Sequence, residues 1–216
     1  MTQTLQTTAQ AAGTADPDVI RGEDGVLRPR WAAKDELLRA YYDEEWGFPV
    51  RDEQGIFERI CLEGFQSGLS WSTILRKRPA FREVCEGFDP EKVASFGEKT
   101  IAELLADERI IRNPRKIHAM IRNARATLQL REAEGLADLV WSFEEPEPHP
   151  WRCWADIPSS TPASAALARR LKAAGFSFVG PTTMFALMQA IGIINCRVPL
   201  GGEESRREPG AGHLPL

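Results

Sequence analysis

Proline and glycine divide the middle of this chain into short segments, each with the boundary signals of a helix. Asp89-Pro90 and Thr161-Pro162 each place a capping residue directly before a proline at the first helical position. Gly192 stands where such a helix ends. Between these boundaries apolar residues recur at helical spacing, and no alternating strand pattern is convincing. We therefore expect an all-α fold, an orthogonal bundle of short helices.

The two ends of the chain differ in composition from its middle. Residues 1–27 are rich in Thr, Ala, Gln and Gly without an apolar period, and residues 201–216 are rich in Gly, Glu, Arg and Pro. Such segments bury too little apolar surface to fold, so we expect a disordered N-terminal tail and a flexible C-terminal tail. Residues 28–200 remain as one domain, within a chain of 216 residues of which 43% are apolar.

Composition excludes several classes of protein. The sequence has no apolar run long enough to span a bilayer and no charged start followed by an apolar stretch, so we expect no membrane segment and a cytoplasmic location. The four cysteines are widely spaced and form no CxxC pair, which argues against a disulfide framework. A formal net charge of -4 gives no general attraction to nucleic acid, so DNA binding would need a local basic patch.

One such patch lies between residues 109 and 125, which include six basic residues and no acidic one. The turn at Arg112 and Asn113 separates two predicted helices and can point backbone N–H groups at a phosphate, with Arg115 and Lys116 closing around it. The turn lacks the glycines of the common helix-hairpin-helix phosphate clamp. A solvated helix face is therefore an equal alternative.

Two segments, residues 41–47 and 61–71, have the composition of a pocket for a flat ring. Aromatic faces would lie above and below a nucleobase, and a carboxylate at its edge would accept hydrogen bonds from an exocyclic amine. A cationic alkylated base would be attracted to both the rings and the carboxylate. The alternative is that the tryptophans pack in the core and the acid is paired. The residues that fit the specification are Tyr41, Trp46, Glu63 and Trp71, with Trp31 upstream.

In these segments and several others the chain resembles the DNA-N3-methyladenine glycosylase I family, within the helix-hairpin-helix glycosylase superfamily. The resemblance covers roughly residues 31–196, in order and with family-like spacing. The matching blocks are YYDEEWGFP at 41–49, ICLEGFQSGLSW at 60–71, FDPEKV at 88–93, IIRNPRKIHAMIRNARA at 110–126, WSF at 141–143 and GFSFVGPTTMFALMQAIGIIN at 175–195.

The resemblance implies a monofunctional DNA N-glycosylase of base excision repair. Such an enzyme turns N3-methyladenine out of alkylated double-stranded DNA and hydrolyses its glycosidic bond. On the family's pattern Glu63 is the catalytic candidate, the carboxylate that recognises the base edge. Trp71 is the stacking face and Tyr41 a second pocket aromatic, while Trp31 and Trp46 line or support the pocket.

The resemblance also implies that the hairpin region with Arg112, Asn113, Arg115 and Lys116 holds the DNA backbone. No lysine is positioned by motif to form a Schiff base, and no cofactor is implied. We expect a monomer, because no exposed apolar stripe is left unassigned. Two alternatives stay open: a glycosylase for a different alkylated base, and a non-catalytic module that binds damaged DNA.

The chain departs from the family at its metal site. The family commonly joins its two chain ends through a zinc held by two cysteines and two histidines. In this chain those positions read Pro29, Tyr42, Arg197 and Gly201, none of which is a zinc donor. We therefore predict no zinc, with packing around Tyr42, Pro29 and Val198 joining the ends instead.

Overall fold

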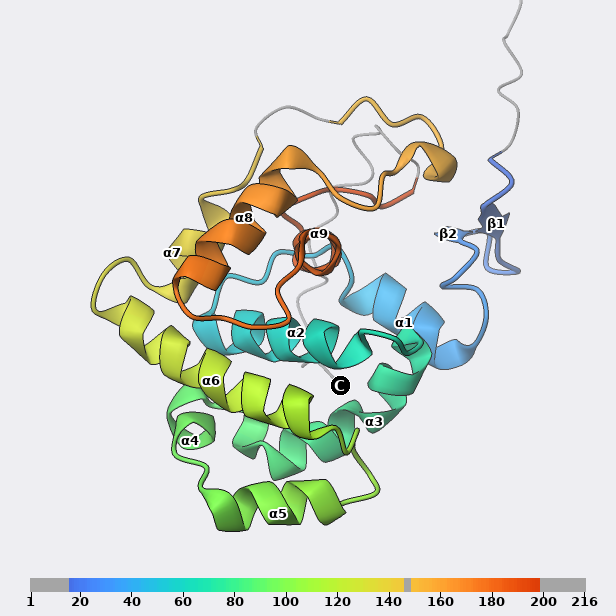
Figure 1. The fold of residues 1–216 in the computed structure, drawn as a ribbon. Helices are drawn as coiled ribbons and strands as arrows, with labels where there is room; N and C mark the ends of the chain where they lie inside the picture. The colour runs from blue at the N-terminus through green and yellow to red at the C-terminus, as the bar shows by residue number, and fades with distance from the viewer. Residues whose placement is uncertain (1–15, 146–148, 199–216) are drawn as a thin grey trace, which may run out of the picture.

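The computed structural model describes residues 16–145 and 149–198, and within them the chain forms a bundle of short helices with one small sheet (Figure 1). This confirms the predicted all-α fold. The helices are α1 Glu36–Glu44, α2 Glu53–Gln66, α3 Trp71–Val84, α4 Pro90–Ala94, α5 Glu98–Ala106, α6 Pro114–Arg131, α7 Leu136–Trp141, α8 Pro162–Ala173 and α9 Pro181–Ala190. No helix in the described ranges is long and apolar enough to cross a membrane.

The helices begin where the capping residues predict. The side chain of Asp89 accepts hydrogen bonds from the first turn of α4, and Thr161 does the same for α8 through the N–H of Ser164. A proline follows each cap at the first helical position. Gly192, just after α9, has a φ of 80°. This left-handed conformation often ends a helix, and glycine adopts it without steric strain.

Helix α2 lies at the centre of the bundle, in contact with α3, α6, α7 and α9 (Figure 1). Its residues Ile56, Phe57, Ile60 and Leu62 are almost completely buried. The apolar residues of α2 need other elements packed against them, which explains the central place of the helix. The same helix carries Glu63, so the fold places this acid among apolar neighbours.

The N-terminal segment departs from the predicted tail. Strand β1, Val19–Arg21, pairs with β2, Leu27–Pro29, in an antiparallel hairpin that begins inside residues 1–27. The buried guanidinium of Arg28 donates to Asp43 on α1, at 2.6 Å between Nη2 and Oδ2, and so fastens the hairpin to the bundle. Composition missed this because the hairpin is stabilised by a side chain on α1, outside residues 1–27. Residues 1–15 of the predicted N-terminal tail and the whole predicted C-terminal tail, 201–216, lie outside the described residues.

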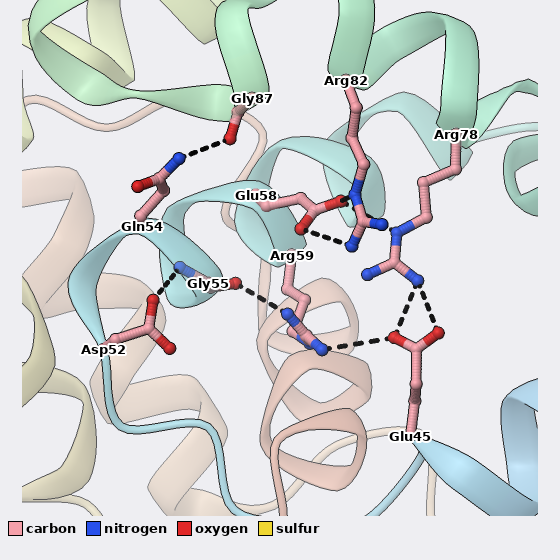
Figure 2. Close-up of polar contacts among 9 residues, drawn as sticks. All are labelled: Glu45, Asp52, Gln54, Gly55, Glu58, Arg59, Arg78, Arg82 and Gly87. Atoms are coloured by element: carbon pink, nitrogen blue, oxygen red, sulfur yellow. Dashed lines mark hydrogen bonds and ion pairs between the residues drawn. The ribbon is translucent and has the colours of Figure 1, made fainter. Parts of the chain in front are cut away.

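A buried network of charged side chains joins the first three helices (Figure 2). Arg78 on α3 donates to Glu45, the residue after α1, and to Glu58 on α2, at 2.7 and 2.8 Å. Arg82 on α3 also reaches Glu58, and Arg59 on α2 lies 3.4 Å from Glu45. Burial acts to raise the pKa of Glu58, but hydrogen bonds from Arg82 and Arg78 hold that pKa below its usual value.

Candidate active site

A cavity of about 340 Å³ opens between α1, α2, α3 and α9. All five side chains that the sequence analysis assigned to a ring-binding pocket line it. The ion network fixes the walls, because Tyr41, Glu63 and Trp71 lie on the three helices that the network joins. The lining residues are Trp31, Lys34, Leu38, Tyr41, Trp46, Glu63, Gln66, Ser70, Trp71, Ser72, Trp154, Ala186 and Gln189.

The aromatic side chains of the cavity form a continuous series of ring contacts. The Trp71 and Tyr41 ring centroids are 5.5 Å apart, and Tyr41 is followed by Trp31 at 6.4 Å. Trp31 contacts Trp46 at 5.6 Å, and Trp46 contacts Trp154 at 6.1 Å. Rings at these spacings and angles attract one another, so each wall of the cavity is supported by a neighbouring ring. Sequence reasoning did not identify Trp154.

Glu63 is the acid of the cavity. It is only 6% exposed, and in the described part of the chain no hydrogen bond or ion pair reaches its carboxyl group. Burial raises the pKa of Glu63 to about 8, so the group is largely protonated at neutral pH. Burial, and then the nearby Glu63, also raise the pKa of Tyr41. An unpartnered acid beside aromatic faces is ready to receive a hydrogen-bonding or cationic ligand.

The residues of the predicted DNA-binding turn have different surroundings in the structure. Arg112 and Arg115 are exposed, and within the described residues the one ion pair of these two arginines is that of Arg112 with Glu108 at 3.5 Å. The Asn113 side chain caps α6 by accepting from the N–H of Lys116 at 3.3 Å. The two arginines therefore remain available to phosphates at the start of α6, whereas the asparagine serves the helix.

Lys116 requires a correction, because its ammonium group is not available to a phosphate. The residue is buried, and its Nζ donates to the carbonyl oxygens of Phe65 and Ser67 at 2.8 and 2.6 Å. Burial lowers the pKa of Lys116. These carbonyls belong to the end of α2, whose last C=O groups lack helical partners. Lys116 thus fastens the start of α6 to the end of α2, close to Glu63.

A second helical hairpin, α8 and α9, was missed as a DNA-binding candidate. Its turn runs from Gly175, with a φ of 95°, to Gly180, and α9 begins with no side-chain cap. The buried Asn123 on α6 holds the turn through two hydrogen bonds with the backbone of Ser177. A turn bounded by glycines leaves the first N–H groups of α9 open to an anion. The glycines of GFSFVGP were the sequence signal.

The residues at the family's zinc positions do not fit a metal. Pro29, Tyr42 and Arg197 offer no zinc donor, and Gly201 lies outside the described residues. No cluster of three or more His, Cys, Asp or Glu in the described ranges is arranged to hold a metal ion. Cys196, next to one of the positions, is buried, and its Sγ accepts from Gln189 at 3.2 Å.

Direct contacts join the chain ends at these positions. The Arg197 guanidinium carbon lies 4.5 Å from the ring centres of both Tyr42 and Phe48, and Nη1 donates to the carbonyls of Tyr42 and Trp46 at 2.5 Å. The hydroxyl of Tyr42 accepts from the N–H of Val198 at 3.0 Å. Of the residues that the hypothesis named, Tyr42 and Val198 do meet. Pro29 instead pairs with β1.

Fold and cavity together define a helical protein whose pocket suits a flat ring bearing an amine or a positive charge. A family model described as methyladenine glycosylase matches residues 31–199. The chain belongs to the methyladenine glycosylase family, which confirms the resemblance found in the sequence.

Individual relatives span nearly the same region. The chain is 46% identical to DNA-3-methyladenine glycosylase 1 of Escherichia coli over 171 residues, 78% of this chain and 91% of the relative. It is 38% identical to DNA-3-methyladenine glycosylase of Haemophilus influenzae over 173 residues, 79% and 94% of the two chains. A solved 3-methyladenine DNA glycosylase I from Staphylococcus aureus matches with a TM-score of 0.75 at 29% identity, covering 82% of this chain and 94% of its own.

Proposed function

We propose that this protein is a DNA repair glycosylase that extrudes N3-methyladenine from alkylated double-stranded DNA and hydrolyses its bond to deoxyribose. The observation that carries the proposal is the cavity, in which aromatic rings surround one buried, unpartnered carboxyl group. The solved relative from Staphylococcus aureus was studied for its recognition of 3-methyladenine. Membership of the same family supports the same base for this pocket.

The substrate supplies much of the chemistry. Methylation at N3 makes the base cationic, so the glycosidic bond is weakened and the base departs neutral when water attacks the sugar carbon. The enzyme therefore needs no acid to protonate the leaving group. Its contribution is to extrude the nucleotide, hold it and exclude ordinary bases.

Glu63 and the rings select the cationic base. A cation in the cavity favours the ionised form of Glu63, which then accepts hydrogen bonds from the exocyclic amine at the base edge. The faces of Trp71 and Tyr41 attract the same positive charge. Neutral adenine gains less from each of these contacts, so the discrimination follows from charge as well as shape.

The duplex is held outside the cavity by exposed groups of three segments. Arg112 and Arg115 contact phosphates at the start of α6, and the open N–H groups of α9 contact another. Leu69, 41% exposed, lies between the lining residues Gln66 and Ser70, so it borders the mouth of the cavity. There it can fill the space that the extruded base leaves in the stack. We propose that the protein does this as a cytoplasmic monomer.

Methylated duplex DNA tests the proposal, because it contains both N3-methyladenine and N7-methylguanine. Purified protein is incubated with it and the released bases are separated and quantified. Release of N3-methyladenine with little N7-methylguanine is the expected result. Release of a different alkylated base would move the assignment to that lesion. No release by a folded protein that binds DNA would contradict the proposal and favour a damage-binding module.

A further inference from the structure

We propose that Trp154 is a specificity-determining residue, which forms the last wall of the cavity and limits the size of the alkyl group on the base. The inference rests on the proposed function and deepens it. Trp154 starts a short 3-10 turn, Trp154–Asp156, in the long connection between α7 and α8. Among the described residues of this connection, it is the one that lines the cavity.

Trp154 closes a wall that the helices leave incomplete. The other aromatic lining residues come from residues 31–71, whereas Trp154 arrives from a distant part of the chain. Its ring centroid lies 6.1 Å from that of Trp46, with 42° between the planes, so it continues the series of rings. The side chain is partly exposed, as expected for a residue at the border of an open cavity.

The backbone around Trp154 is fastened at two places. The Asp156 carboxylate accepts from the N–H groups of Arg152 and Cys153 at 2.9 and 3.1 Å, which closes the turn. Asp16, ahead of β1, accepts from the N–H of Trp154 itself at 2.5 Å. The backbone that carries the indole is therefore held by Asp16, in a part of the chain that composition assigned to a tail.

Trp151 fastens the same connection at a third place. Its ring meets Phe185 of α9 edge-on, with centroids 6.1 Å apart. Trp151 does not line the cavity. The connection therefore offers two tryptophans three residues apart, one at the cavity and one against the bundle, which makes Trp151 a matched control.

The position of Trp154 predicts selection by size. With Glu63 at one edge of the base and the rings of residues 31–71 at its faces, the proposal places the alkyl substituent toward Trp154, where a larger substituent would have to displace the indole. A large, rigid indole on a fixed backbone resists displacement by a larger substituent. Rejection of one extra methylene by such a pocket is typically on the order of 10- to 200-fold. Replacing Trp154 with a small residue should remove most of that rejection.

The experiment compares DNA carrying N3-methyladenine with DNA carrying N3-ethyladenine. The ratio of kcat/KM for the two is measured for wild type, Trp154→Ala, Trp154→Leu and Trp151→Ala. We expect Trp154→Ala to shift the ratio toward the ethyl base by about 10-fold or more, with Trp154→Leu between it and wild type. Trp151→Ala should keep the wild-type ratio, whatever it does to stability.

Equal ratios in wild type and both Trp154 variants would overturn the inference, as would an equal shift in Trp151→Ala. If wild type releases neither base, the proposed function fails instead. Calorimetric binding of the free N3-methyladenine and N3-ethyladenine bases to the same proteins then decides the question. Discrimination that is lost only in the Trp154 variants supports a size limit set by Trp154, and unchanged discrimination contradicts it.

Discussion

The guanidinium of Arg197 lies against the ring of Tyr42, 4.5 Å from its centre, and donates to the Tyr42 carbonyl. The two residues occupy positions where the family commonly has zinc ligands. Their contact joins the C-terminal end of the domain to α1 without a metal. Because Arg197 also donates to the carbonyl of Trp46, the same contact supports a wall of the cavity.

The first prediction concerns the contact between Arg197 and Tyr42. Arg197→Ala should lower the free energy of unfolding by about 2 kcal/mol, because it removes a cation–π contact and charged hydrogen bonds. Arg169→Ala, on the exposed face of α8, is the control and should change little. Thermal unfolding is measured with and without a strong chelator. A wild-type melting temperature that falls in chelator, with zinc recovered from the protein, would contradict a metal-free domain.

Stability should depend on pH through Glu63. Its pKa is about 8 in the folded protein against 4.5 as the ordinary value, so the folded state binds more protons between these limits. The stability that protonated Glu63 retains is fully present below pH 4.5 and is lost as pH rises toward 8. Between pH 4.5 and 8, the free energy of unfolding of Glu63→Gln should rise relative to that of wild type by on the order of 3 to 5 kcal/mol. The free energy of unfolding of both proteins is measured from pH 5 to 8.5. A constant difference between them across this range would contradict the raised pKa.

The buried ion network should be far more sensitive than a surface pair on the same helix. Arg78→Met leaves Glu45 and Glu58 without their shared partner and should cost about 3 to 5 kcal/mol in denaturant unfolding. Arg76→Met removes an exposed pair with Asp35 and should cost less than about 1 kcal/mol. Similar losses for the two variants would contradict the account of how α1, α2 and α3 are held together.

Substitution of different basic residues at the start of α6 should affect different properties, DNA binding for one and stability for the other. Arg115→Ala should weaken duplex binding and reduce the slope of log affinity against log salt by about 1, because it removes one phosphate contact. Lys116→Met should lower stability and leave that slope unchanged, since its ammonium group binds Phe65 and Ser67. A reduced slope for Lys116→Met, at full stability, would return it to the phosphate contacts.

Features that depend on neighbouring residues were predictable. The helix starts at Asp89 and Thr161 depend on a cap and a proline beside each other, and the structure has them where the sequence predicts. The family and the all-α fold were confirmed as well. The segments that resemble the family also identified residues of the cavity wall. They include Tyr41, Glu63 and Trp71, all of which line the cavity.

Features that depend on distant partners were not predictable. Lys116 contacts Phe65 across 51 positions, Asp16 contacts Trp154 across 138, and Arg197 contacts Tyr42 across 155. A basic residue at a helix start looks the same in sequence whether it faces solvent or a buried carbonyl. The roles of these residues follow only from the folded chain.

Single-turnover release of N3-methyladenine from a duplex, by wild type and by Glu63→Gln, tests the central claim most directly. Glu103→Gln, an exposed acid on α5, is the control for loss of a carboxylate. The account predicts rapid release by wild type and by the control, with release by Glu63→Gln slower by about 10- to 100-fold, as expected when a charged hydrogen-bond partner of the base is lost. Equal rates in all three folded proteins would mean that Glu63 does not recognise the base.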